Sequence, residues 1–340
     1  MASSQDAQSS CPGSEEEEVR PATLLDKEAV LKIDPNYHGL DYLADCYTSY
    51  TQGPGSTGYV LKKGDEVVGF FSCQLVDAGH TLVTSGGRIL EGHRGGGFYG
   101  RATKKVFETF RGSGLCNIAM VLNNVNLKNY GDKLLKQYQM VHSRESAAYT
   151  VDMDAIRKSD LSKTAADMKG IHQLTSEEEL QLLMSVAGDC LFPEGRVLIE
   201  LKPFRIMEEN ARFILHGGTH ERAILVSGAG TDLSSESPEK YSAKDLLFSC
   251  GSYFYNQVGV SYLVDMYATG IADSSEEVQK HLEWHFLRLI NTLKPSKAYF
   301  HVFFERQLNA EMEALSSVYP NTRSDFPFTK MSVLEMEYKQ

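Results

Sequence analysis

The chain has 340 residues, which is long enough for two domains that each bury their own hydrophobic core. Its apolar and charged fractions are 42% and 23%, as in ordinary globular proteins, and no apolar run is long enough to cross a membrane. The formal net charge of −11 disfavours a nucleic-acid or anionic-membrane surface, because both need clustered Lys and Arg. We therefore expect neither partner.

The N-terminal segment and the cysteines indicate the compartment. Residues 1–19 are rich in Ser, Gln and Glu and lack the apolar stretch of a signal peptide, which predicts an acidic disordered tail. No two of the six cysteines are near neighbours, so the chain has no CxxC motif. A reduced, cytoplasmic protein is the simplest interpretation.

The first half, residues 20–156, predicts a mixed sheet flanked by helices, an α/β (α+β) fold. The order is a strand, two helices, a three-stranded meander, a glycine-rich loop, a helix, a strand, a helix and a strand. The predicted ranges are a strand within 20–25, helices over 26–33 and 40–50, strands over 58–63, 66–75 and 80–90, a helix over 101–110, a strand over 117–122, a helix over 127–138 and a strand over 147–151.

The second half repeats part of this rhythm. Residues 157–170 are polar and predict a linker, after which residues 171–340 form the second domain. Its closing part predicts a strand, a helix, a strand and a helix over 260–267, 275–293, 298–304 and 308–318. The segment 270–275 stands where the glycine-rich loop should be. We interpret this half as a second copy of the fold that has lost its phosphate cradle.

The strongest motif is the glycine-rich loop itself, in which a strand runs through Arg94, Gly95, Gly96 and Gly97 into a helix. Consecutive glycines allow positive φ angles, and their N–H groups can form an anion nest beside a helix N-terminus. A pyrophosphate suits such a nest, although a flexible surface loop is the alternative interpretation. No Gly-Lys-Ser/Thr follows, so the loop is not a Walker motif.

This loop resembles that of the GNAT superfamily of N-acetyltransferases. The superfamily signature is Arg or Gln, two residues, Gly, one residue, then Gly or Ala. Arg94 and Gly97 match it, Tyr99 departs from it at the last position, and Gly100 comes one place late. The segment 39–43, the turn at 77–79 and the long C-terminal extension also resemble the histidine N-acetyltransferase-like family of animals.

The resemblance implies an acetyl-coenzyme A site and no metal. The backbone of Ile89 and Leu90 would pair with the pantetheine arm. The loop amides would hold the pyrophosphate, and Asn126, after the next strand, could also contact the cofactor or belong to an ordinary polar loop. The loop residues so assigned are Arg94, Gly95, Gly96, Gly97, Phe98, Tyr99 and Gly100.

Acetyl transfer to an amine needs a base, and the leaving thiolate needs a proton or a hydrogen bond. Glu91, at the strand end, is a candidate base or else a solvated turn residue. Leu135 stands where many superfamily members have a catalytic tyrosine. Tyr130 and Tyr138 are the nearby substitutes, although either could serve packing alone.

The acceptor is predicted from resemblance as a small amine, with free histidine as the first choice. Arg88 could meet its carboxylate, and Tyr42 or Tyr47 could form an aromatic wall. His281 and His285 lie four apart on a predicted helix, a spacing that permits metal ligation, but we interpret them as ordinary surface or core histidines.

The sequence thus predicts an acetyl-coenzyme A-dependent N-acetyltransferase acting on the α-amino group of a small molecule. Two alternatives remain open at this point. The first is a protein or peptide N-acetyltransferase, which the acidic composition favours for basic substrates. The second is an acyl-coenzyme A-binding module whose catalysis has decayed, which Tyr99 and Leu135 suggest.

Overall fold

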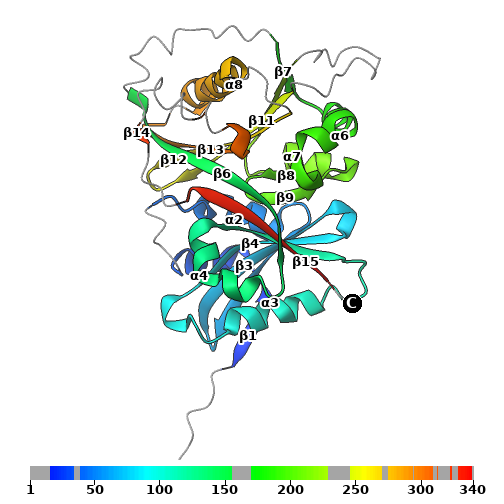
Figure 1. Cartoon of the computed structure of the whole chain (residues 1–340). Coiled ribbons are helices and arrows are strands. Elements are labelled where there is room, and N and C mark those ends of the chain that lie inside the picture. The colour runs from blue at the N-terminus through cyan, green and yellow to red at the C-terminus, as the bar shows by residue number, and fades with distance from the viewer. Residues whose placement is uncertain are drawn as a thin grey trace, which may run out of the picture.

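The computed structural model describes residues 16–33, 39–154, 170–228, 246–269, 275–293, 295–308, 312, 322–323 and 328–338. Two α/β halves lie one above the other, and a single continuous sheet runs through both (Figure 1). Thirteen strands of the described residues form this sheet, with helices packed on its faces. The predicted mixed sheet flanked by helices is confirmed.

The first half follows the predicted order of elements. Its last strand is its longest. This strand begins well before the predicted range 147–151, because it runs past both halves of the molecule. The elements are β1 (Glu17–Pro21), α1 (Lys27–Leu31), α2 (Leu43–Gln52), β2 (Ser56–Lys63), β3 (Glu66–Val76), β4 (Thr81–Ile89), α3 (Phe98–Glu108), β5 (Asn117–Asn123), α4 (Asn124–Leu134) and β6 (Gln139–Asp152).

The end of the predicted disordered tail is in fact an edge strand. Glu17 and Glu18 belong to β1, which pairs with β2 so that Glu17 lies opposite Lys63 and Glu18 opposite Lys62. Opposite charges on neighbouring strands stabilise such a pairing, which explains why an acidic sequence is ordered here. The other predicted tail residues, 1–15, lie outside the described residues, as does nearly all of the predicted linker.

The second half repeats part of the order of the first, and the hairpin 196–205 is added to it. The loop segment 270–274 and most of the predicted helix 308–318 lie outside the described residues. The elements are β7 (Ile171–Leu174), α6 (Glu177–Leu191), β8 (Arg196–Ile199), β9 (Lys202–Arg205), α7 (Ala211–His216), β10 (Ala223–Ser227), β11 (Leu247–Asn256), β12 (Gly259–Ala268), α8 (Ser275–Arg288), β13 (Lys297–Phe304), β14 (Thr322–Arg323) and β15 (Lys330–Glu337).

The two halves exchange their last strands. The order across the sheet is β1-β2-β3-β4-β5-β15-β6-β13-β12-β11-β10-β7. Thus β15, from the C-terminal end of the chain, lies between β5 and β6 of the first half, and β6 pairs with β13 of the second half. In Figure 1, β6 and β15 cross from one half to the other. The halves are therefore parts of one sheet.

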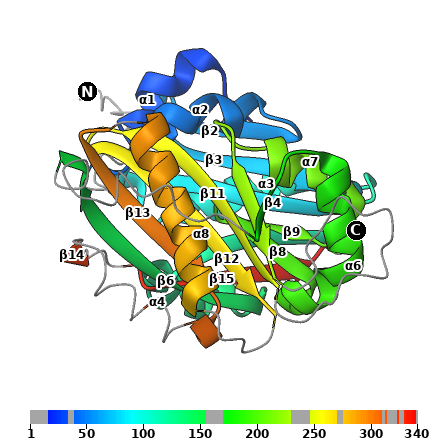
Figure 2. The same ribbon diagram turned by 90° about the horizontal axis from the view of Figure 1, so that it is seen from above.

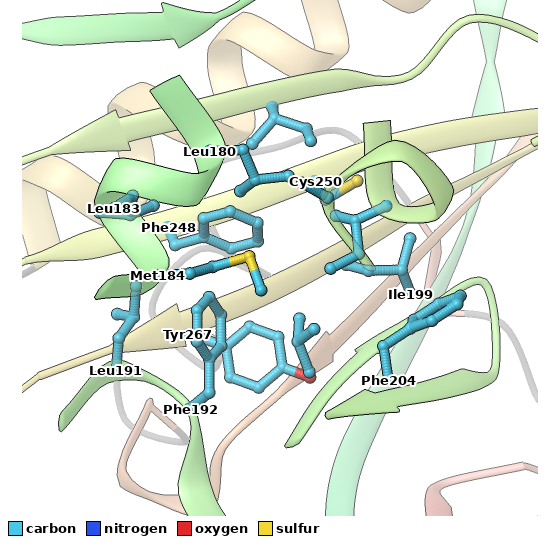
Figure 3. Close-up of a cluster of buried hydrophobic side chains, with 14 of the residues drawn as sticks. Leu180, Leu183, Met184, Leu191, Phe192, Ile199, Phe204, Phe248, Cys250 and Tyr267 are labelled. Atoms are coloured by element: carbon cyan, nitrogen blue, oxygen red, sulfur yellow. The ribbon is translucent and has the colours of Figure 1, made fainter. Parts of the chain in front are cut away.

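Separate cores lie on the faces of this sheet. In the first half, α3 covers one face with Phe98 and Val106, while α1 and α2 cover the other with Val30 and Leu43. In the second half, α6 packs Leu180 and Met184 against aromatic side chains that include Phe192, Phe248 and Tyr267 (Figure 3). Helix α8 covers the remaining core.

The histidine pair of α8 belongs to this last core. His281 and His285 are both fully buried, and both contact the Ser249 hydroxyl, at 2.7 Å and 2.8 Å. Burial lowers the pKa of His281 to about 3, because the low-dielectric interior disfavours the charged ring. They are neutral core histidines, as interpreted from the sequence.

The five described cysteines are free thiols: Cys46, Cys73, Cys116, Cys190 and Cys250. None of the helices in the described ranges is long and apolar enough to span a membrane.

Candidate functional site

The central feature of the first half is a pair of parallel strands that separate. β4 and β5 are paired from Thr81 and Asn117 as far as Thr84 and Met120. Beyond that point β4 continues to Ile89 without pairing to β5, while its other edge stays on β3. A gap between parallel strands, open at their carboxyl ends, leaves backbone groups unpaired and is where sheets of this kind bind ligands.

The separation begins at a β-bulge in β4. Phe70 lies opposite Arg88 and Ser72 opposite Ser85, so Gly86 and Gly87 together face a single residue of β3. Gly86 has φ +67°, a conformation that glycine adopts without strain. The bulge turns the end of β4 away from β5 and re-aims its backbone groups.

The glycine-rich loop follows this strand directly. Gly95 and Gly97 have φ +83° and +73°, and α3 begins one residue later. A side chain at Gly95 or Gly96 would meet no atom within 4 Å. Among the described residues, the N–H groups of Gly95, Gly96 and Gly97 donate to no other backbone group. Together with the free first-turn amides of α3, they can receive an anion such as a pyrophosphate.

Two arginines flank the loop. The Arg94 Nε donates to the Ile89 carbonyl at 2.9 Å, and Arg101 Nη1 donates to the Gly96 carbonyl at 2.8 Å. Arg101 is also paired with Glu17 at 2.6 Å, and its side chain is 56% exposed. Arg101 was not among the cofactor residues predicted from the sequence, although a cation on the first turn after a glycine loop would have indicated it. It adds positive charge beside the anion nest.

The departure from the signature at Tyr99 has a structural partner. A β-carbon at Gly87 would lie 2.4 Å from the Tyr99 hydroxyl, so only glycine fits opposite this tyrosine. The Tyr99 ring also packs edge-on against Phe71, with ring centroids 5.6 Å apart. The bulky residue of α3 is thus accommodated by a missing side chain in the bulge of β4.

The two strand-end residues predicted to pair with pantetheine differ in their available groups. The Leu90 amide donates to Val68 and its carbonyl accepts from His93, so both groups already have partners. Because Leu90 bonds to β3 and hydrogen-bonding sides alternate along a strand, the Ile89 amide faces the gap beside β5. Pairing with the pantetheine arm therefore stays a prediction for Ile89.

Arg88, predicted to meet a substrate carboxylate, is held by another residue. Its guanidinium donates to both oxygens of Asp41 at 2.9 Å and 3.2 Å, and its side chain is almost fully buried. Asp41 also accepts from the Leu43 amide at the start of α2. The pair therefore fixes the start of α2 against the end of β4, and contact between Arg88 and a substrate stays a prediction.

An aromatic wall lies on the α2 side of the bulge. A β-carbon at Gly86 would be 3.5 Å from both the Tyr42 hydroxyl and the Tyr50 ring. Tyr42 packs against Tyr50 and against Phe254 of β11, with centroids 5.2 Å and 5.9 Å apart. Both halves therefore contribute to this wall. Tyr47, the other predicted wall residue, is fully buried in the core and donates to the Thr23 carbonyl.

The chain is similar to known proteins in sequence and in fold. No protein-family model matches the chain. A curated human protein, "Probable N-acetyltransferase 16", is 26% identical over 214 residues. That match covers 59% of this chain and 57% of the human protein, so it spans just over half of each.

Several solved structures match nearly the whole chain, among them the following two. A tandem GNAT protein from the clavulanic acid biosynthesis pathway has a TM-score of 0.54 and 13% identity, covering 96% of this chain and 99% of its own. The N-myristoyltransferase of Saccharomyces cerevisiae, solved with bound myristoyl-CoA, has a TM-score of 0.55 and 11% identity, covering 99% and 86%. The chain has a tandem GNAT fold. The separated strands β4 and β5 and the following glycine loop belong to its first GNAT unit.

The predicted catalytic residues of this GNAT unit lie in different environments. Glu91 is exposed in a short turn just after β4. Tyr130 is 56% exposed on α4, whereas Tyr138 is buried, and its burial raises its pKa to about 12. Asn126 lies in the first turn of α4, where its backbone amide donates to the side-chain oxygen of Asn123. Their catalytic or cofactor roles stay predictions.

The second GNAT unit has the same parallel pair, but the gap beyond it is filled. β12 and β13 are paired as far as Asp265 and Phe303. Past this point the Arg144 guanidinium, from β6, donates to the carbonyls of Met266 and Phe303 and to the Asp265 carboxylate at 2.9 Å. Arg144 is fully buried. In the second unit, an arginine side chain thus bonds strand-end backbone groups whose counterparts in the first unit face the gap.

Proposed function

We propose that the chain is an acetyl-coenzyme A-dependent N-acetyltransferase whose single cofactor site lies between β4 and β5. The observation that carries the proposal is the gap after Thr84 and Met120. It leads to the amides of Gly95, Gly96 and Gly97, which donate to no other backbone group in the described part of the chain. A strand edge suits a pantetheine arm, and a glycine nest suits a pyrophosphate. The human relative and the tandem GNAT structure support this choice.

The reaction requires a neutral amine to attack a thioester carbonyl. The bulge at Gly86 and Gly87 lies where the two strands separate, and backbone amides that face the gap there would stabilise the developing oxyanion. Glu91 is the candidate base, directly or through water, because it follows the strand end. Tyr138, which is buried, and Tyr130, which is largely exposed, remain the two candidates for the proton donor.

As acceptor we propose the α-amino group of a small molecule, with free histidine first. The aromatic wall of Tyr42, Tyr50 and Phe254 beside the bulge supports a planar ring as the substrate side chain. The cytoplasm remains the proposed location, and a boundary near residues 157–170 remains the proposed division into units.

A panel of acceptors tests the proposal. The purified chain and acetyl-coenzyme A are incubated with the free amino acids, histidine amide and a basic peptide, and acetylated products are measured by mass spectrometry. We expect acetylhistidine as the main product. Acetylation of the peptide without acetylation of free histidine would establish the protein acetyltransferase alternative. Binding of acetyl-coenzyme A without any product would establish the decayed module.

A further inference from the structure

A tight hairpin of the second GNAT unit reaches the first unit. β8 and β9 are joined by the two-residue turn Glu200-Leu201, both at positive φ, +51° and +61°. Positive φ at two successive residues is usual for Asn and Gly and strains Glu and Leu. Such strain persists only where the surrounding structure fixes it, and it gathers at functional sites. The residue that follows the turn is Lys202.

This hairpin lies beside the separated strands. β9 contacts both β4 and β5, and Figure 2 shows β8 and β9 next to β4. Leu201 packs in a small cluster with Val121 of β5 and Phe254 of the aromatic wall. Val121 comes just after Met120, where the pairing of β4 and β5 ends. The second unit thus places its hairpin tip at the proposed acetyl-transfer site.

Lys202 brings a buried positive charge to this position. It is only 4% exposed, and its Nζ lies 4.7 Å from the centroid of the Tyr50 ring. Tyr50 in turn lies against Gly86 of the bulge. The ammonium therefore lies one aromatic ring away from the backbone at which acetyl transfer is proposed. The ring face is a favourable neighbour for a cation but does not neutralise its charge.

The nearest carboxylate is already used by another cation. Glu200 accepts from Arg222 Nε and Nη2 at 3.0 Å and 2.7 Å, a bidentate pair. Within the described part of the chain, no carboxylate forms an ion pair with Lys202 within 4.0 Å. Lys202 and Arg222 therefore share Glu200, while Asp265, whose charge also acts on Arg222, is itself paired with Arg144. Burial lowers the pKa of Lys202, which the charge of Glu200 partly offsets.

A buried charge without an ionic partner is costly, and an anionic ligand would remove that cost. We infer that Lys202 binds the carboxylate of the acceptor, so that the second GNAT unit selects free amino acids for acetylation by the first. This inference rests on the proposed acetyltransferase function. The aromatic wall would receive the substrate side chain, and the carboxylate would bridge from the amine to Lys202. A peptide acceptor has no carboxylate beside its reactive amine.

The test compares histidine with histamine, which has the same imidazole and amine but no carboxylate. For the wild-type chain we expect kcat/KM to be about 10- to 100-fold higher for histidine, as for other charge-assisted hydrogen bonds. Lys202→Met should remove this preference by raising KM for histidine, with histamine turnover changed little. Lys202→Arg should restore part of the preference, because it keeps the charge.

Controls separate this inference from the proposed function. Lys32→Met, at an exposed position at the end of α1, should leave both substrates unaffected. Acetyl-coenzyme A affinity measured by calorimetry reports whether Lys202→Met keeps its fold. Equal losses of kcat for both substrates, with a shifted pH profile, would mean that Lys202 is a base and overturn the inference. If the wild-type chain acetylates no amine, it is the proposed function that fails.

Discussion

The two GNAT units contain the same pair of parallel strands but differ in what lies beyond the point where they separate. Between β4 and β5 the strand edge is open and leads to a glycine nest. Between β12 and β13 the Arg144 guanidinium bonds carbonyls of both strands. The same backbone geometry is therefore the proposed ligand site in one unit and an internal joint in the other. Arg144 comes from the exchanged strand β6, so this joint also ties the halves together.

The closed unit also contributes residues to the proposed acceptor side of the first unit. It supplies β15 to the first unit's sheet, Phe254 to the aromatic wall and Lys202 beside the bulge. A unit that gives up its own site can shape the acceptor side of its neighbour. The predictions below challenge this division of labour, beginning with the largest expected effect.

Gly97→Glu should abolish binding of acetyl-coenzyme A, with affinity falling by at least about 100-fold. The side chain would strain a residue at φ +73° and place a negative charge in the anion nest. Calorimetry measures the affinity. Gly64→Glu is the matched control, because Gly64 also has positive φ and open space around it but lies in the β2–β3 turn. Equal affinity of the two variants would show that the loop is not the cradle.

Arg144→Met should lower the free energy of unfolding by about 3–5 kcal/mol, since it leaves the buried Asp265 carboxylate without its cation. Urea denaturation measures the loss. Arg306→Met, at an exposed position, should change stability by less than about 0.5 kcal/mol. If the two variants are equally stable, Arg144 is not the joint of the closed unit.

Gly87→Ala should destabilise the chain by about 1–3 kcal/mol, because the added methyl would lie 2.4 Å from the Tyr99 hydroxyl. In a Tyr99→Phe background the same substitution should cost less, since the nearest atom is gone. A double-mutant cycle followed by urea denaturation measures the difference. A cost independent of Tyr99 would contradict the pairing of this tyrosine with the bulge.

The last prediction concerns the closed unit's buried histidines and the change of stability with pH. The pKa of His281 is about 3 in the folded chain and about 6.5 in the unfolded chain, so below pH 6.5 only the unfolded chain takes up this proton. The free energy of unfolding should therefore fall as pH drops from 6.5 toward 3, by up to about 1.4 kcal/mol per pH unit for this group.

His281→Gln should reduce that slope, whereas His216→Gln, at an exposed position, should leave it unchanged. Chemical denaturation between pH 7 and pH 4 measures both slopes. A slope that is the same in the wild type and in His281→Gln would mean that this ring is not held neutral.

Features set by neighbouring residues could be predicted from the sequence. The meander and the Arg94–Gly97 loop each depend on local backbone chemistry, and the structure has them at the predicted places. Partnerships over long stretches of chain could not be predicted. Arg144 meets a carboxylate 121 residues away, and Lys202 reaches Tyr50 from the other half. Hydrophobic periodicity carries no information about such contacts.

The acceptor side shows the same limit. Tyr42 and Tyr47 were equivalent candidates for the aromatic wall, since both belong to one predicted helix, 40–50. The tertiary structure places Tyr42 against Gly86 and Phe254, whereas Tyr47 is packed on Phe70 with its hydroxyl bonded to Thr23. Which face of α2 meets the bulge is decided by the Asp41–Arg88 pair, whose partners are 47 residues apart.

The stoichiometry of acetyl-coenzyme A binding tests the central claim most directly. Isothermal titration calorimetry of the full chain should give one site per chain, and Gly97→Glu should remove it. The open gap of the first unit and the Arg144 joint of the second both lead to this value. Two sites per chain, or one site that survives Gly97→Glu, would contradict the division into an open and a closed GNAT unit.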